Sequence, residues 1–224
     1  LGGRLVWFAA ELGGKNPLLV LEDADPERAA AGAVQASFAN AGQLCISIER
    51  IYVTEPHWAV FTEQFVAKTK SLTMGPGYDW NTDVGSLSSQ AQLDKVTAAV
   101  EDAKAKGATV LTGGLPRPDL GPFFFEPTVL TDVTPDMDIY AHETFGPVVS
   151  LYRVANDAAA VHRANDSEYG LNASIWSRRN GKGVATQIQA GTVNVNDGYG
   201  AAWASYGAPM GGMKQSGIGR RHGL

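Results

Sequence analysis

The 224-residue sequence has a single cysteine, Cys45, so no internal disulfide can form. This usage is typical of a reducing compartment, and we expect a cytoplasmic protein. No apolar run approaches the roughly 20 residues that a membrane helix needs. Basic residues are scattered and the formal net charge is −5. These absences argue against a membrane or a nucleic acid as the partner.

Three common ligand-binding signatures are incomplete. GIGRRHG, residues 217–223, has one residue too many for G-x-G-x-x-G and follows no strand directly. In GAPMGGMK, residues 207–214, Met213 separates the second glycine of a phosphate loop from Lys214. In HETFG, residues 142–146, Gly146 stands where a zinc helix needs its second histidine. We therefore expect no nucleotide loop and no metal site in these forms.

Apolar residues make up 44% of the chain, enough for a substantial core. Short apolar runs alternate with amphipathic stretches, which predicts an α/β domain with a mostly parallel sheet flanked by helices. We expect strands at 5–10, 17–21, 50–53, 108–112, 147–154, 172–177 and 192–196, an extended segment at 122–133, and helices at 26–39, 56–72, 88–107, 156–166 and 183–191. The tail from Asp197 is expected to be a glycine-rich loop.

Cys45 lies in FANAGQLCISIERIYV, residues 38–53, between a predicted helix and a predicted strand. A lone cysteine is most often a small apolar core residue, and Gly42 alone is explained as a helix C-cap. The alternative is a nucleophilic thiol, with backbone N–H groups of the turn directed at an oxyanion. The C-cap does not explain Gln43 or Cys45, so both interpretations stay open from the residues alone.

Glu11 opens ELGGKNP, residues 11–17, at the carboxyl end of a predicted strand. Ligands of open α/β sheets bind at such ends. The alternative is a tight turn at Gly13 and Gly14, flanked by a solvated Glu11 and a solvated Lys15.

HETFGPV, residues 142–148, places Glu143 and Phe145 just before a predicted strand. A carboxylate and an aromatic ring there can hold a hydroxyl pair and a flat ring. The alternative is an ordinary strand entry at Gly146-Pro147. His142 could form a dyad with Cys45, although a single histidine is more often a packing or surface residue.

Six stretches occur together in one order: ELGGKNP, FANAGQLC, HETFGPV, NDSEYGLNASIWS, AGTVNVN and APMGGMKQSGIGRRHG. This series resembles the aldehyde dehydrogenase superfamily from about Leu5 to Leu224. The sequence around Cys45 and that of the last motif are most similar to the NADP-type succinate-semialdehyde dehydrogenase branch.

The resemblance implies a role for each motif residue. Cys45 corresponds to the nucleophile and Glu11 to the general base. Glu143 corresponds to the residue that binds the nicotinamide ribose hydroxyls, and Phe145 lines the nicotinamide. Leu12 would face the nicotinamide amide through its backbone carbonyl. No histidine is needed in such a mechanism.

The implied cofactor is NADP or NAD, with NADP favoured, and the implied substrate is an aldehyde, with succinic semialdehyde first. Members that use this aldehyde often carry an arginine six residues before the nucleophile, where this chain has Ala39. Two rival functions stay open: a cysteine-dependent hydrolase or thioesterase, and a non-catalytic assembly domain.

The resemblance also implies a division of the chain. Residues 1–16 correspond to a remnant of the cofactor-binding domain with the base loop, and residues 17–224 to the catalytic domain. The sequence begins without Met. We therefore expect a fragment of a longer, homo-oligomeric enzyme, with little or no dehydrogenase activity by itself.

Overall fold

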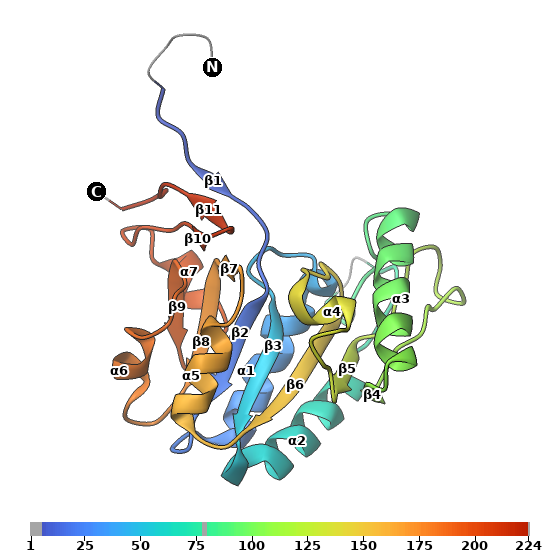
Figure 1. Ribbon diagram of the computed structural model, residues 1–224. Helices are drawn as coiled ribbons and strands as arrows, with labels where there is room; N and C mark the ends of the chain where they lie inside the picture. The colour runs from blue at the N-terminus through green and yellow to red at the C-terminus, as the bar shows by residue number, and fades with distance from the viewer. Residues whose placement is uncertain (1–5, 78–79, 224) are drawn as a thin grey trace.

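The computed structural model describes residues 6–77 and 80–223 (Figure 1). Within these residues, seven strands form one sheet in the order β4-β5-β6-β3-β2-β8-β9. All neighbours are parallel except β4 and β5, which are antiparallel. The strands are β2 (Asn16–Val20), β3 (Ile48–Thr54), β4 (Thr109–Thr112), β5 (Thr128–Thr131), β6 (Val148–Val154), β8 (Asn172–Trp176) and β9 (Thr192–Val195). The expected mostly parallel α/β sheet is confirmed.

Helices cover both faces of this sheet. The helix α5 crosses in front of the strands in Figure 1, and α1 lies behind them, packed against α2. The main helices are α1 (Pro26–Phe38), α2 (Trp58–Lys70), α3 (Gln90–Ala105) and α5 (Asp157–Asn165), and the short ones are α4 (Asp138–Ala141), α6 (Gly181–Ala185) and α7 (Gly200–Ala204). The predicted start of α1 is confirmed: Asp25 caps it by accepting from the Arg28 N–H, and Pro26 occupies the first turn.

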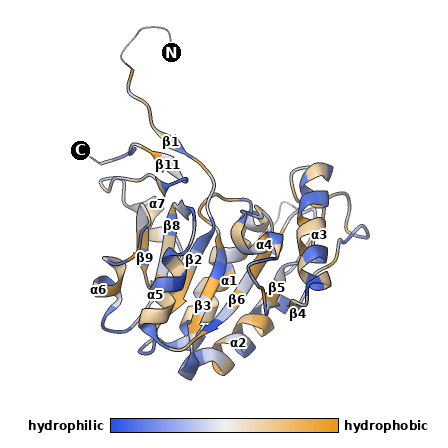
Figure 2. Cartoon of the chain, in the orientation of Figure 1, coloured by the Kyte–Doolittle hydropathy of each residue, from blue (hydrophilic) through white to orange (hydrophobic). Residues whose placement is uncertain are grey.

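The core lies between the sheet and these helices. Every residue of β2 and β3 is buried, as expected for strands covered on both faces. Figure 2 shows the consequence: the central strands are mainly apolar, while the helices carry both apolar and polar residues. Phe38 of α1 stacks on Phe65 of α2, which stacks on Phe61. Burying each such ring contributes about 1.5–3 kcal/mol.

Two small antiparallel ribbons lie beyond the upper end of the sheet in Figure 1. In one, β1 (Ala10–Glu11) pairs with β11 (Gly217–Ile218). In the other, β7 (Tyr169–Gly170) pairs with β10 (Met213–Lys214). Residues near the two ends of the chain are therefore neighbours in space.

Three sequence-based expectations differ from the structure. The strand predicted at 5–10 is reduced to β1, because Val6 to Ala9 have no strand beside them and Trp7 is 85% exposed; Leu5 lies outside the described residues. The helix predicted at 183–191 is the shorter α6, since the chain turns at Thr186 toward β9. The tail is not all loop, because α7, β10 and β11 form within it.

No helix in the described part of the chain is long and apolar enough to cross a membrane.

Candidate active site

Segments far apart in the sequence meet at the amino ends of three adjacent strands. Residues 12–15 lead into β2, residues 39–47 into β3 and residues 142–147 into β6, and these strands are neighbours in the order β6-β3-β2. Since parallel strands begin at the same end of a sheet, the three loops gather at the upper end of the sheet in Figure 1.

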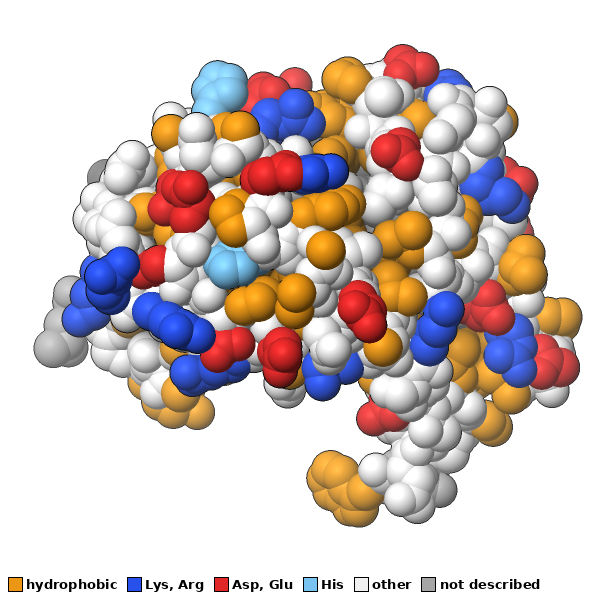
Figure 3. Space-filling model, turned by 90° about the horizontal axis from the view of Figure 1, so that it is seen from below, with side chains coloured by type: hydrophobic (Ala, Val, Ile, Leu, Met, Phe, Trp, Pro, Cys, Tyr) orange, Lys and Arg blue, Asp and Glu red, His pale blue; other side chains and the backbone are white. Residues whose placement is uncertain are grey.

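The position of Glu11 corrects one expectation. Glu11 does end a strand, but that strand is β1, which lies outside the seven-stranded sheet. Because only a few residues separate β1 from β2, the carboxyl end of β1 adjoins the amino ends of the sheet strands. The opposite edge of the sheet (Figure 3) carries mixed acidic and basic side chains, including Glu22, Asp23, Arg178 and Arg179.

The loop before Cys45 has an unusual backbone. After α1, the 3₁₀ turn η1 (Ala39–Gly42) contains three successive residues with positive φ: Asn40 at 53°, Ala41 at 53° and Gly42 at 69°. Each non-glycine residue in this region costs about 1–2 kcal/mol. The Gln43 side chain offsets this by accepting from the Ser88 N–H and donating to the Ser86 carbonyl. Gln43 thus ties the turn to the next loop.

Gly42 has a second constraint besides its φ angle. A Cβ atom built on Gly42 would lie 2.1 Å from the carbonyl oxygen of Gly146, far inside contact distance. Gly146 is equally confined, since a Cβ there would lie 2.5 Å from a methyl group of Val96. The simple C-cap interpretation of Gly42 is therefore incomplete, because this glycine also lets the Cys45 loop rest on the Glu143 loop.

Cys45 is half-buried and lies at the edge of a small apolar cluster of Ile46, Leu171 and Met210, separate from the main core. Its carbonyl accepts from the Asn16 side-chain amide at 2.8 Å. Within the described chain, the Cys45 N–H donates no hydrogen bond to another residue. This amide is thus free to serve an oxyanion.

The charges around Cys45 oppose ionisation of its thiol. Burial raises the pKa of Cys45 above its ordinary value, and the carboxylates of Glu11 and Glu143 raise it further, whereas Arg221 lowers it. These effects bring Glu11, Glu143 and Cys45 into one electrostatic environment, and the resting thiol is protonated at neutral pH.

Glu143 packs against the two glycines that follow Glu11 and Leu12. Its Oε1 accepts from the Gly14 N–H at 2.9 Å, and a Cβ on Gly13 would lie 2.7 Å from its Oε2. Burial raises the pKa of the Glu143 carboxyl, while the bond from Gly14 opposes this. Oε2 accepts no hydrogen bond from the described residues, so it can accept one from a ligand hydroxyl.

The remaining two predicted cofactor residues frame this carboxylate. Phe145 is partly exposed and has a positive φ of 53°, which its N–H bond to Glu49 Oε1 at 3.0 Å helps to hold. Leu12 is 55% exposed, and its N–H donates to the Ser216 carbonyl at 2.9 Å. Both side chains are therefore at least partly accessible to solvent.

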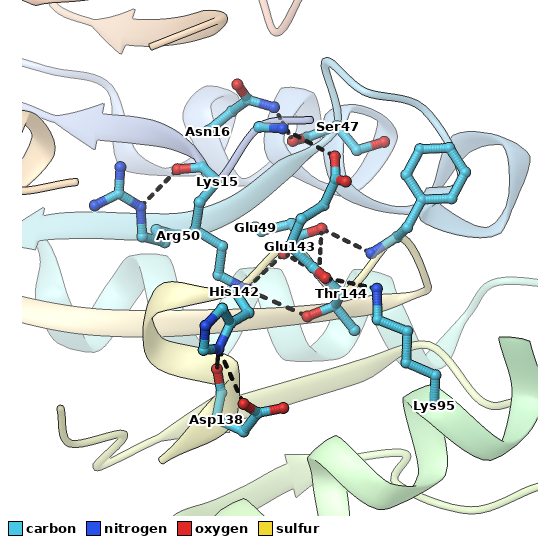
Figure 4. Close-up of polar contacts among 12 residues, drawn as sticks. Lys15, Asn16, Ser47, Glu49, Arg50, Lys95, Asp138, His142, Glu143 and Thr144 are labelled. Atoms are coloured by element: carbon cyan, nitrogen blue, oxygen red, sulfur yellow. Dashed lines mark hydrogen bonds and ion pairs between the residues drawn. The ribbon is translucent and has the colours of Figure 1, made fainter. Parts of the chain in front are cut away.

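A buried ion pair fixes the loop that carries Glu143 (Figure 4). Lys15 is 1% exposed and its Nζ lies 2.5 Å from Glu49 Oε2, so the expectation of a solvated Lys15 is wrong. Glu49 also accepts from the Thr144 and Phe145 N–H groups at 3.0–3.1 Å. Burial lowers the pKa of Lys15, and the Glu49 carboxylate opposes this. The pair thereby links β2, β3 and the entry to β6.

Sequence reasoning missed this pair, although one signal was present. An acid in a strand that is buried on both faces, as Glu49 is in β3, requires a buried partner, but nothing local identifies Lys15 as that partner. Arg50, the next residue of β3, is also buried, and its Nε donates to the Lys15 carbonyl at 2.7 Å.

Glu11 also has a partner that the sequence did not predict. The Nε of Arg221 lies 2.5 Å from Glu11 Oε1. Arg221 follows β11, more than 200 residues after Glu11, so only the β1–β11 ribbon brings the two together.

His142 lies apart from this arrangement. Its ring contacts the Asp138 carboxylate at 2.9 Å (Figure 4), and its side chain is 70% exposed. It is not among the groups that act on the Cys45 thiol. Among the described residues, no group of three His, Cys, Asp or Glu side chains could hold a metal ion.

Together these residues supply a thiol, a carboxylate near it, a free backbone N–H and a second carboxylate with an open oxygen. This set can form and hydrolyse a covalent thioester.

Comparisons with known proteins show what this chain is similar to. The profile described as "Aldehyde dehydrogenase family" matches residues 2–224. A Mycobacterium tuberculosis protein is 54% identical over 99% of this chain and 43% of its own length, and its name assigns it provisionally as an NADP(+) succinate-semialdehyde dehydrogenase. A Mycolicibacterium smegmatis protein with a similar provisional name is 56% identical, with the same coverage.

Solved structures agree with the fold. The NAD+ complex of an aldehyde dehydrogenase from Bacillus cereus has a TM-score of 0.88 and 40% identity, over 96% of this chain and 43% of that chain. A structure described as an Escherichia coli NADP-dependent enzyme has a TM-score of 0.89 and 35% identity, over 96% of this chain and 44% of that chain. The chain thus spans less than half the length of the relatives that it matches.

Proposed function

Because this chain belongs to the aldehyde dehydrogenase family, we propose that it carries the chemical site for NAD(P)-dependent oxidation of an aldehyde to a carboxylate. One observation supports this most directly: the single thiol is half-buried in the field of the two predicted carboxylates, Glu11 and Glu143. An inert core cysteine would have no reason to share its environment with two acids.

Cys45 is the nucleophile in this proposal. Glu11 accepts the thiol proton, directly or through water, and the sulfur forms a bond to the aldehyde carbon. The resulting thiohemiacetal oxyanion accepts a hydrogen bond from the free Cys45 N–H. When that carbon loses hydride, a thioester remains on Cys45. Glu11 passes this first proton to solvent and then takes a proton from the water that attacks the thioester. The carboxylic acid leaves and loses its own proton to solvent, while Glu11 returns its proton to the departing sulfur and so restores the thiol.

The cofactor is NADP or NAD, and the residues present fit it. Glu143 Oε2 is open to accept from a ribose hydroxyl. The partly exposed Phe145 ring would line the nicotinamide, and the Leu12 backbone carbonyl would face its amide. A bound nicotinamide would supply the hydride acceptor. The role of Glu143 is to orient that ring before transfer, and the Lys15–Glu49 pair holds the Glu143 loop in place. NADP is favoured because the two mycobacterial relatives are named for it.

Succinic semialdehyde is the first candidate substrate, again from the names of those relatives. Ala39, at the position of the expected carboxylate-binding arginine, is a small, partly exposed residue at the start of η1. A charged partner for the substrate carboxylate must therefore come from another position, or the natural aldehyde lacks that carboxylate.

An activated-ester assay tests the two catalytic assignments. With p-nitrophenyl acetate, we expect a burst of nitrophenolate from acylation of Cys45, followed by slower steady turnover. Cys45→Ala should abolish the burst. Glu11→Gln should slow the steady phase by about 100-fold, within the usual range for a general base. His142→Ala is the matched control and should change neither phase.

The ester assay also tests the first rival function, the cysteine-dependent hydrolase. Loss of turnover only in His142→Ala would favour the cysteine hydrolase. Iodoacetamide labelling tests the second rival: a Cys45 thiol that stays unlabelled even at alkaline pH would favour the assembly domain.

A further inference from the structure

Arg221 contacts the proposed base, and no role has been assigned to it so far. Its Nε lies 2.5 Å from Glu11 Oε1, and the two side chains are 46% and 20% exposed. Glu11 Oε1 is itself buried from solvent and accepts no hydrogen bond from the described residues, so its contact with Arg221 is one of charge. A carboxylate in such a position needs a charged partner.

The backbone holds Arg221 in this position. Its N–H donates to the Met210 carbonyl and its carbonyl accepts from the Met210 N–H, both at 2.7 Å. Its Nη2 also lies 3.5 Å from the Met210 sulfur. The guanidinium is thus directed toward Glu11 from two sides, by a main-chain bridge and by a side-chain contact.

Arg221 also acts on the thiol that Glu11 serves. Glu11 raises the pKa of Cys45, and Arg221 lowers it. The cation therefore stands within electrostatic range of both the base and the nucleophile. Since the guanidinium is already engaged by Glu11, it is not a free cation for a substrate carboxylate.

We propose that Arg221 is a positioning residue for Glu11. The guanidinium holds the Glu11 carboxylate in place through their charge contact, so that the carboxylate can accept a proton from the water that attacks the Cys45 thioester. The planar fork suits this better than a lysine, because it contacts the carboxylate and the Met210 sulfur at once. This inference rests on the function proposed above.

The ester assay tests this role of Arg221, because the burst depends on Cys45 whereas the steady phase depends on Glu11. In Arg221→Gln, the burst amplitude should be unchanged, while the steady phase should fall by about 10- to 100-fold, the loss expected when a base is misplaced by about 1 Å. Arg221→Lys should recover part of the steady rate, since the charge returns without the fork. A simple loss of folding would instead reduce both phases together, and thermal unfolding of each variant checks this.

Arg220→Gln is the matched control. Arg220 is the adjacent arginine, but its guanidinium donates to the Gly212 and Gly219 carbonyls and not to Glu11. An equal loss of steady rate in this variant would assign the effect to the loop and overturn the proposal. In a Glu11→Gln background, Arg221→Gln should cause no further loss, and an additional loss there would show that Arg221 does not act through Glu11.

The outcomes also distinguish the inference from its premise. If Glu11→Gln slows the steady phase and Arg221→Gln does not, Arg221 has no positioning role, but the base assignment stands. If Glu11→Gln has no effect, the proposed function itself fails.

Discussion

At the scale of single residues, the acidity of Cys45 is determined by groups from three separate loops. Burial and two carboxylates favour the neutral thiol, and only Arg221 and the local backbone N–H act the other way. Each unit of pKa corresponds to about 1.4 kcal/mol of preference between the two protonation states. We therefore expect the resting thiol to react slowly at neutral pH.

The pH dependence of alkylation should show this directly. We expect the iodoacetamide rate of Cys45 to follow an apparent pKa above that of an ordinary cysteine, so the thiol is mostly unreactive at neutral pH and becomes reactive as pH rises. Glu11→Gln removes a negative charge and leaves Arg221, so the profile should move to lower pH.

Glu22→Gln serves as the control, because Glu22 lies at the opposite edge of the sheet and should leave the profile unchanged. A shift to higher pH in Glu11→Gln would mean that the Glu11 carboxylate is not a neighbour of the thiol.

At the scale of elements, the site depends on close contact between loops that enter adjacent parallel strands. The Cys45 loop touches the Glu143 loop through Gly42 and Gly146. The Glu143 loop in turn rests on Gly13 and Gly14. These glycines let the loops approach more closely than any residue with a Cβ would allow, which is a packing requirement distinct from a turn preference.

Two alanine substitutions separate these two requirements. Gly42 and Gly107 both have positive φ, 69° and 103°, but a Cβ on Gly107 meets nothing within 4 Å. Gly107→Ala should therefore cost only the backbone strain of about 1–2 kcal/mol. Gly42→Ala should cost clearly more, because Gly146 must also move.

Urea unfolding of both variants gives the two free energies. Equal losses would show that the contact between Gly42 and Gly146 adds nothing to stability.

The longer elements could be predicted from the sequence because their signals are local. Asp25 and Pro26 mark the start of α1, and the apolar runs at β2 and β6 are long enough to identify a strand. The two-residue strands β1, β7, β10 and β11 could not, since each exists only through a partner 43 or more residues away. The sequence around each of these strands does not indicate which distant segment will pair with it.

The candidate site was predictable only in part for the same reason. Cys45, Glu11 and Glu143 are identified by the motifs around them, and the structure brings all three into one environment. Their roles stay predictions until tested. Lys15 and Arg221 gave no signal, because their partners Glu49 and Glu11 lie 34 and 210 positions away.

At the scale of the whole molecule, the chain covers 43% of its mycobacterial relatives. The described residues include a carboxylate suited to the nicotinamide ribose, while no dinucleotide fingerprint occurs in the sequence. We propose that the remaining cofactor contacts come from sequence outside these 224 residues. The division at residue 16, the homo-oligomer and the cytoplasmic location stay predictions.

We therefore expect the Cys45 thiol of these 224 residues to react with an alkylating agent, but no reduction of the cofactor. These 224 residues, mixed with succinic semialdehyde and NADP⁺, should produce no NADPH absorbance at 340 nm above background. The same preparation should still react with iodoacetamide at Cys45, which shows that the absence of turnover does not reflect a missing thiol. Robust NADPH formation would mean that the cofactor site is complete within this chain.

The backbone contact between Gly42 and Gly146 has a consequence for engineering. A segment transplanted from a relative to alter aldehyde preference, spanning 39–47, would arrive shaped to fit its original neighbour. Unless residues 143–147 are exchanged with it, the graft should displace the loop that carries Glu143. The two segments therefore form one unit for exchange.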